Sequence, residues 1–424
     1  MGSVKNLIYD PSMSGGVYYA APTPDHFGLG AWKVSGRFSV ADLKGLIPPV
    51  EIENKGAIMA MMTAAYFEQA RKEGFPTTYV GLLSPDERIV DVDMLMQRGD
   101  ISDTVIMLLA NAPANSTSKE LAEYHAAVNN DETCVYVADT ESIFRAGFPL
   151  GSSSFKKIFE MAGRGHEYEH VATYDETVQV LDDIRHQIDL RGWTQFQHLR
   201  DYLDSLSLWH VPNPGETITS PVLNFTTKFA LSGDEDISEA EAERRMGVDH
   251  DTYLQWKNLV EQCAKNQIEF CKERGIVNID GKIEGVVAHE KLYIADFACT
   301  PDENRLMIPY EYAESGKPHA TYLIPTNKEM QRAMFRAEGV YLAIDAAKEE
   351  ATRKGNKDQW RDYLFNHISR QKLDDVAEAS CDMMGDALRT VANLVLGRKV
   401  FEARPMEEWI GPFLPYASRV QPKI

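Results

Sequence analysis

The sequence lacks three features that mark large classes of protein: paired cysteines, long apolar runs and an excess of basic charge. Its five cysteines form no CxxC pair, which favours reduced thiols over a disulfide framework. No stretch approaches the ~18 apolar residues of a membrane-spanning helix. The amino terminus shows no basic region followed by an apolar run, as a secretion signal would. We therefore expect a soluble, cytoplasmic protein.

Acidic residues outnumber basic ones, and the formal net charge is -20. This balance argues against a protein that wraps nucleic acid, because binding to phosphate backbones needs a basic face. A small anionic ligand remains compatible with it, since a few arginines in a cleft outweigh the global charge locally. The expected partners are therefore small molecules rather than nucleic acid or a membrane.

The chain has 424 residues, 44% of them hydrophobic, which is enough to bury a large core and exceeds a typical single domain. The first fifty residues alternate short apolar runs with turn residues, and "KGAIMAMMTAAYFEQARK" (55–72) predicts a helix. Residues near 100–135 are polar and indicate a surface excursion. A second polar stretch, 158–218, contains two amphipathic patterns, at 176–190 and 193–210.

The clearest helical pattern covers residues 251–275, with Tyr253, Trp256, Val260, Cys263 and Phe270 near one stripe. Three consecutive strands are predicted after it, at 276–279, 281–288 and 291–298. The last hundred residues are mostly helical in pattern.

The segment "DGKIEG" carries a cluster of charges with strand spacing. Alternate residues of a strand face the same way, so Asp280, Lys282 and Glu284 would line one surface. An ordinary solvated strand alternates in the same manner. Asp296 favours the functional interpretation, because it lies in the apolar run "LYIADFA", where a bare carboxylate is costly without a partner. Two acids beside a lysine suit Mg²⁺ and nucleotide phosphates.

A second constellation is "ESIFRAGFPLGSSS", which begins at Glu141. Arg145 offers a bidentate contact to an anion, and the glycine and serines that follow, including Ser152, offer backbone amides and hydroxyls. The alternative is a polar loop that caps a helix starting near Phe155.

Seven short motifs follow one another along nearly the whole chain: "SGRFSVAD", "NKGAIMAMMTAAYF", "ESIFRAGFPLGS", "TTKFALSGDEDIS", "DGKIEG", "IADFACTPDENRL" and "LVLGRKVF". Each is weak alone. Their collinear order resembles the SAICAR synthetase family (phosphoribosylaminoimidazole-succinocarboxamide synthetases of purine biosynthesis).

The resemblance implies an α+β fold with two lobes and a nucleotide cleft, similar to the ATP-grasp and kinase-like arrangement. It divides the chain into a mostly β lobe (1–85), a substrate-loop region (86–220) and an ATP- and Mg²⁺-binding lobe with carboxyl-terminal helices (221–424). Insertions near 95–135 and 158–218 would reshape the substrate pocket, form a lid or make a homo-oligomer contact. The implied reaction joins the carboxylate of an aminoimidazole ribonucleotide to the amine of aspartate, using ATP and Mg²⁺ through an acyl phosphate.

Carried over by position, Glu284 and Asp296 would bind Mg²⁺ and Lys282 the ATP phosphates. Arg145, Ser152 and Arg305 would hold the phosphate and carboxylate of the substrate. Asp280 and Asp234 would line the reaction centre beside Lys282, and the backbone amides of Gly15 and Gly16 would face the nucleotide. The other implied substrate positions are Arg37, Ser39, Asp42, Lys55, Gly56, Glu141, Lys228 and Asp302.

The chain departs from the family pattern at three places. Met13-Ser14-Gly15-Gly16 stands where the family carries basic residues that touch ATP, Gly36 replaces an acid, and Phe297 replaces another. These differences leave three alternatives beside SAICAR formation: a ligase for another carboxylate or amino acid, a kinase-like phosphotransferase with Asp280 as base, and a catalytically silent nucleotide-binding relative.

Overall fold

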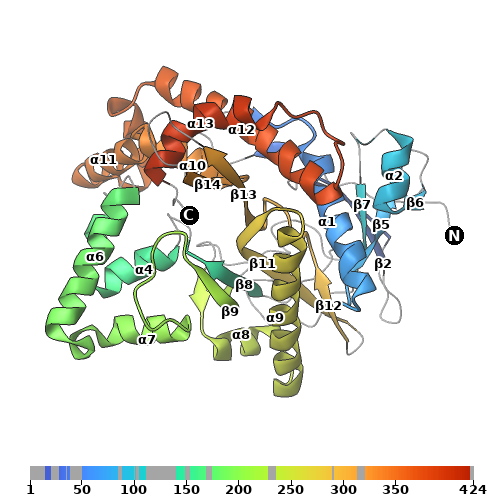
Figure 1. Cartoon of the computed structure of the whole chain (residues 1–424), viewed down its shortest axis with the longest axis horizontal. Helices are drawn as coiled ribbons and strands as arrows, with labels where there is room; N and C mark the ends of the chain where they lie inside the picture. The colour runs from blue at the N-terminus through green and yellow to red at the C-terminus, as the bar shows by residue number, and fades with distance from the viewer. Residues whose placement is uncertain are drawn as a thin grey trace.

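The computed structural model describes residues 15–20, 28–34, 36–38, 50–84, 88–99, 101, 105–110, 140–148, 153–168, 174–227, 235–288, 291–312 and 320–420. Two large antiparallel sheets, a separate two-stranded pair and the covering helices make up this part of the chain, as Figure 1 shows. The expected α+β class is confirmed.

The first sheet comes from the amino-terminal part of the chain. Its described strands are β1 (Gly15–Ala20), β2 (Gly28–Val34), β5 (Tyr79–Leu83), β6 (Ile89–Val90) and β7 (Val105–Ala110), in the order β1-β2-β7-β5-β6. Helix α1 (Lys55–Lys72) packs on it, and α2 (Val92–Arg98) follows β6. Strands β3 (Arg37–Phe38) and β4 (Val50–Glu51) pair with each other.

The second sheet is built from residues 140–325 and holds most of the charged residues discussed above. Its described strands are β8 (Thr140–Gly147), β9 (Thr217–Thr227), β10 (Asp236–Ile237), β11 (Val277–Ala288), β13 (Asn304–Tyr312) and β14 (Ala320–Pro325), in the order β10-β9-β8-β11-β13-β14. Strand β12 (Lys291–Ala295) also pairs with β11.

A helical segment separates β8 from β9 in sequence. It contains α4 (Ser153–Met161), α5 (Gly165–Tyr168), α6 (Tyr174–Arg191), the 3₁₀ helix η2 (Trp193–Phe196) and α7 (Gln197–Ser205). These elements bury their own cluster, with Phe155, Phe159, Leu181 and Leu203 fully inside. The amphipathic helix expected at 176–190 is confirmed as part of α6, which reaches the last helix of the chain. The one expected at 193–210 is confirmed in part, because η2 and α7 cover it only as far as Ser205.

Helices α8 (Glu239–Met246) and α9 (His250–Lys272) connect β10 to β11. Asp249 caps α9 by accepting a hydrogen bond from the backbone amide of Thr252 at 2.8 Å. The predicted apolar stripe of α9 is buried, and its Trp256 lies directly over β11. A Cβ atom on Gly285 would lie 2.0 Å from the Trp256 ring, so only glycine permits this approach of helix to strand.

The carboxyl-terminal part is helical, as its sequence predicts. It contains α10 (Lys328–Ala337), α11 (Val340–Arg353), the 3₁₀ stretch η3 (Lys357–Asn366), α12 (Arg370–Leu396) and α13 (Met406–Val420). Helix α12 crosses α1, and one hydrophobic cluster unites these helices with residues of both sheets (Figure 1). None of the helices in the described part is long and apolar enough to span a membrane.

Two local predictions are wrong. Residues 105–110 are not a surface excursion, because β7 lies between β2 and β5 in the middle of the first sheet, with Ile106 fully buried. The strands expected at 276–279 and 281–288 form one strand, β11, whose register against β13 shifts between Asn278 and Gly281. An irregularity of this kind resembles a strand break in sequence because a glycine and a polar residue interrupt the apolar pattern.

Candidate active site

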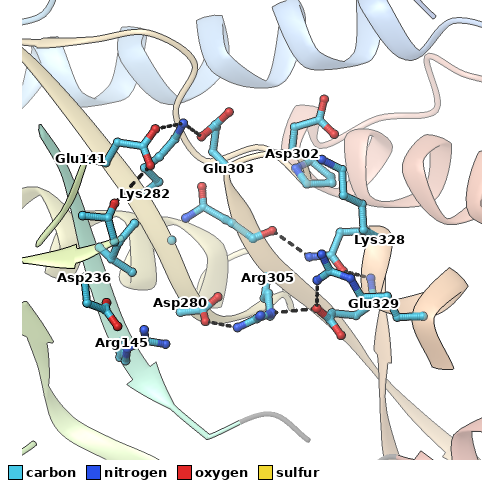
Figure 2. Close-up of a pocket in the computed structure, with 17 residues that line it drawn as sticks. Glu141, Arg145, Asp236, Asp280, Lys282, Asp302, Glu303, Arg305, Lys328 and Glu329 are labelled. Atoms are coloured by element: carbon cyan, nitrogen blue, oxygen red, sulfur yellow. Dashed lines mark hydrogen bonds and ion pairs between the residues drawn. The ribbon is translucent and has the colours of Figure 1, made fainter. Parts of the chain in front are cut away.

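A cavity of about 560 Å³ opens over the second sheet. Its lining comes from β8, β9, β10, β11, the turn before β13, β13 itself and the start of α10. Figure 2 shows charged side chains of both signs pointing into it, with Lys282 at one end and Arg305 toward the other. The site is therefore a convergence of segments that lie nearly two hundred residues apart.

Lys282 is surrounded by carboxylates, and we call it, with its three ion-pair partners, the lysine–acid cluster. Its Nζ lies 2.6 Å from Glu284, 2.9 Å from Glu303 and 3.1 Å from Glu141. Burial lowers the pKa of Lys282, but neighbouring carboxylates, led by Glu303 and Asp296, outweigh it and raise the pKa above its ordinary value. The ammonium form is thus the stable one at neutral pH.

Strand pairing brings Asp296 close to this cluster. Glu284 on β11 lies opposite Ala295, the last residue of β12, so Asp296 follows immediately at the same end of the ladder. Asp296 adopts the left-handed backbone region (φ 62°), which aspartate tolerates better than most residues and which turns the chain out of the strand. Phe297 then stacks on Trp32 of β2, with ring centroids 5.3 Å apart. Phe297 therefore joins this turn to the first sheet.

Glu303 belongs to the lysine–acid cluster but was not predicted as a site residue. Burial raises the pKa of its carboxyl, and Asp296 raises it further, while Lys282 opposes both effects only in part. Its position between the predicted residues Asp302 and Arg305 is the signal that could have identified it. Asp302 itself forms a 2.6 Å ion pair with Lys55 at the start of α1.

The other end of the cavity holds four alternating charges, which we call the arginine–acid quartet: Asp280, Arg305, Glu329 and Arg332. Arg305 pairs with Asp280 and lies 3.3 Å from Glu329, which also contacts Arg332 at 2.5 Å. Figure 2 shows Arg305 between the two acids. Burial lowers the pKa of Arg305, but Asp280 and Glu329 outweigh it and raise it.

Glu329 and Arg332 were not predicted either. Their spacing of three residues at the start of a helix is visible in the sequence. Asn327 caps that helix, because its side-chain oxygen accepts a hydrogen bond from the backbone N–H of Glu329 at 3.0 Å. Nothing in the sequence, however, connects them to Arg305 two dozen residues earlier. Lys328 and Asp236 also line the cavity without having been predicted.

The remaining predicted residues fall into three groups. Glu141 and Arg145 line the cavity from β8, where Arg145 lies opposite Asp280 and donates to Asn224 at 3.1 Å. Gly56 lies in α1 beside Lys55, while Gly15 and Gly16 lie in β1 and Arg37 lies in β3. Outside the described residues lie Ser39, Asp42, Ser152, Lys228 and Asp234.

The charge of the lysine–acid cluster fits a divalent cation carried in with phosphates. Four nearby carboxylates, those of Glu141, Glu284, Asp296 and Glu303, surround one half-buried ammonium group. Within the described ranges, no three or more His, Cys, Asp or Glu side chains form a ready-made metal site. Mg²⁺ commonly binds one or two carboxylates and completes its coordination shell with phosphate oxygens and water. The excess of carboxylates around Lys282 would supply the protein ligands of such an ion.

Known proteins resemble this chain in sequence across the same region. A family model described as SAICAR synthetase matches residues 208–338, which contain β9 to β14 and α10. A protein of Archaeoglobus fulgidus, provisionally named a phosphoribosylaminoimidazole-succinocarboxamide synthase, is 23% identical over 411 residues, covering 96% of this chain and 97% of that protein. The phosphoribosylaminoimidazole-succinocarboxamide synthase of Thermoplasma acidophilum is 28% identical over 144 residues, 34% of this chain and 47% of that one.

Solved structures include SAICAR synthase from Saccharomyces cerevisiae in complex with SAICAR. It is 14% identical to this chain, covers 93% of it and 96% of its own length, and has a TM-score of 0.48.

Proposed function

We propose that this chain, which belongs to the SAICAR synthetase family as a divergent member, is an ATP-dependent ligase that joins a carboxylate to an amine. The observation that carries the proposal is one cavity with a half-buried lysine among carboxylates at one end and paired arginines at the other. Most of this cavity is formed by the residues that the family model matches. Within this class, we propose a carboxylated aminoimidazole ribonucleotide and aspartate as the substrates.

The reaction requires activation because a free carboxylate does not react with an amine. A carboxylate oxygen of the substrate would attack the γ-phosphorus of ATP, giving an acyl phosphate and ADP. The amine nitrogen then attacks the carbonyl carbon, inorganic phosphate leaves, and the nitrogen loses a proton to form the amide. Two accessible steps thereby replace one inaccessible step.

The two charged ends of the cavity suit these steps. The Lys282 ammonium is held in place by three acids, and it would neutralise the charge on the phosphoryl group during transfer. Arg145 and Arg305 line the same cavity and would bind anionic groups of the substrates through planar, bidentate contacts. Asp280 is bound to Arg305, so it would orient that guanidinium rather than accept a proton from a hydroxyl group.

Glu284 and Asp296 would hold Mg²⁺, which supplies neutralisation of the nucleotide phosphates when it is bound. Glu284 is buried beside Lys282, and Asp296 begins the turn after the paired strand. The lysine would keep these acids from repelling one another before nucleotide arrives.

Hydroxylamine trapping tests the proposal without knowledge of the natural amine. The protein is incubated with ATP, Mg²⁺, the carboxylated aminoimidazole ribonucleotide and hydroxylamine, and the hydroxamate and ADP are measured by mass spectrometry. We expect equal amounts of both products, and formation of SAICAR when aspartate replaces hydroxylamine. Lys282→Met should abolish both reactions, while Lys265→Met, at an exposed lysine of α9, should leave them unchanged.

A phosphorylated product that hydroxylamine does not intercept would contradict the ligase and favour a phosphotransferase. Absence of ATP binding by calorimetry in the presence of Mg²⁺ would instead indicate a silent relative. Turnover with other carboxylates alone would retain the ligase and reject the proposed substrate pair.

A further inference from the structure

Asn304 lies between the residues that reach the two charged ends of the cavity. Glu303, before it, belongs to the lysine–acid cluster, and Arg305, after it, belongs to the arginine–acid quartet. Figure 2 shows Glu303 beside Lys282 and Arg305 beside Asp280. Because neighbouring residues of a strand face opposite ways, the side chain of Asn304 points to the other face of the sheet, where the residue is 2% exposed.

Helix α9 packs against β8, β9 and β11 on that other face, and Asn304 is hydrogen-bonded to it. The side-chain amide of Asn304 donates from Nδ2 to Oε1 of Gln267, a fully buried residue of α9, at 2.9 Å. Gly281 of β11 lies opposite Asn304, and a Cβ atom added there would lie 2.1 Å from Nδ2. Asn304 therefore reaches α9 past a position of β11 that only glycine can occupy.

The irregular register of β11 places Asn278 and Asp280 on different faces of the sheet. Residues two apart on a regular strand share a face, but the pairing with β13 shifts between Asn278 and Gly281. Asp280 lines the cavity and pairs with Arg305, whereas Oδ1 of Asn278 accepts a hydrogen bond from Nδ2 of Asn304 at 3.4 Å. The contact between the two amides therefore stabilises the irregularity that brings Asp280 to Arg305.

The backbone around Asn304 is held as well. Its N–H donates to the carbonyl of Thr300 at 2.7 Å, and its carbonyl accepts from the side-chain amide of Asn327 at 3.2 Å. The carbonyl of Glu303 accepts a hydrogen bond from the backbone N–H of Lys282 at 3.0 Å. A residue fixed through both its side chain and its backbone leaves little freedom to its neighbours in the strand.

We propose that Asn304 is a positioning residue that sets Glu303 and Arg305 at the two ends of one cavity. Its side chain faces α9 rather than the cavity, so it acts through these two neighbours. The effect on catalysis rests on the proposed function, because a reaction that uses both ends of a site depends steeply on their alignment. A misplacement of about 1 Å can lower the rate about 100-fold. The positioning itself does not depend on which substrates bind.

Hydrogen exchange at the Nε–H of Arg305 tests the positioning without any turnover. This group donates to Glu329 at 3.3 Å, so its exchange with solvent reports how firmly the guanidinium is held. The exchange rate is measured by ¹⁵N NMR in the full-length protein labelled at arginine, and the signal is assigned by its loss in Arg305→Lys. The test variants are Asn304→Ala and Gln267→Met, measured at a temperature where each is folded.

Asn393→Ala is the matched control. Asn393 also joins two segments through its side chain, because its Oδ1 accepts from the backbone N–H groups of Val400 and Phe401. It lies near the end of α12, away from the elements that line the cavity. We expect exchange at Arg305 to rise at least about fivefold in both test variants, as for the loss of one hydrogen bond that holds the group. The control should leave it unchanged.

The hydroxamate assay tests the catalytic consequence. The kcat per folded protein should fall about 100-fold in Asn304→Ala and about tenfold in Gln267→Met, although Gln267 lies on the far side of the sheet. The double variant should be no slower than Asn304→Ala, because Gln267 acts through Asn304. Asn393→Ala should retain the wild-type kcat.

Unchanged exchange at Arg305 in both test variants would overturn the proposal, as would an equal rise in the control. Faster exchange with an unchanged kcat would also overturn it, because the ligase would then not depend on this alignment. So would a double variant that loses about 1,000-fold, the product of two independent effects.

If Asn304→Ala does not fold, Gln267→Met decides through the same two measurements. A wild-type protein without ligase turnover would reject the proposed function, whereas exchange at Arg305 would still decide the positioning. The two proposals therefore fail separately.

Discussion

Lys282→Met should damage both activity and stability, because the lysine neutralises acids that the fold has already buried. Glu284 is 1% exposed at its side chain and Glu303 is 15% exposed, and both contact the ammonium group within 3 Å. Removing the cation leaves these carboxylates without it in a low-dielectric site. Glu303 would then gain a proton more readily, since burial already raises its pKa.

The magnitude follows from the burial of the pair. Breaking a buried ion pair by removing one partner costs about 3–5 kcal/mol of unfolding free energy. Because the Lys282 side chain is 22% exposed, we expect a cost at the lower end of this range, about 3 kcal/mol. For a chain of 424 residues the unfolding entropy corresponds to roughly 1 °C in Tm per kcal/mol. We therefore expect Tm to fall by about 3 °C.

A double variant separates the structural role from the chemical one. Lys282→Met combined with Glu284→Gln removes both charges, so the stability lost in the single variant should return by about half, or roughly 1.5 kcal/mol. Activity should stay absent, because no ammonium group remains for the phosphoryl group. Urea denaturation and the hydroxamate assay measure the two quantities.

An unchanged free energy of unfolding in Lys282→Met, together with retained hydroxamate formation, would refute this reasoning. It would mean that Lys282 neither balances the buried acids nor acts on the nucleotide.

Three further predictions concern single positions. Asp296→Asn should abolish Mg²⁺-dependent ATP turnover while moving the unfolding free energy by less than about 1 kcal/mol, because Asp296 is only half-buried; a large loss of stability with activity intact would reject its metal role. Gly285→Ala should lower the free energy of unfolding, measured by urea denaturation, by about 1–3 kcal/mol, because the new Cβ would overlap Trp256. Gly397→Ala is the comparison for backbone strain alone, because no atom lies within 4 Å of the Cβ that it adds. The pKa of the Glu329 carboxyl is lowered in the folded protein, so this group stabilises the fold above its ordinary pKa of 4.5 and loses that effect as pH falls through the folded pKa. The difference in unfolding free energy between wild type and Glu329→Gln should therefore shrink from pH 7 to pH 3. A difference that stays constant over this range would contradict the prediction.

The sequence predicts the parts of this fold that depend on local pattern. The stripe of α9 was readable because Tyr253, Trp256, Val260 and Phe270 repeat with helical spacing, and each is buried. The alternation of Asp280, Lys282 and Glu284 likewise indicated a shared strand face, and Lys282 and Glu284 do meet at 2.6 Å. In both cases, neighbours in sequence are neighbours in space.

Contacts between distant segments were beyond such patterns. Glu141 reaches Lys282 only because β8 pairs with β11, and Glu329 reaches Arg305 only because α10 starts beside β13. The central position of β7 was missed for the same reason, since strand order in a sheet has no local signature. Roles carried over from the family resemblance stay predictions at Asp296 and Arg145.

Isotope transfer tests the central claim most directly. The carboxylate substrate is labelled with ¹⁸O at both oxygens, the reaction runs with ATP, Mg²⁺ and the amine, and the released phosphate is analysed by mass spectrometry. Activation through an acyl phosphate predicts one ¹⁸O atom in each phosphate formed, with one left in the amide. Phosphate that carries no label, formed at the same rate as the amide, would contradict the proposed ligase chemistry.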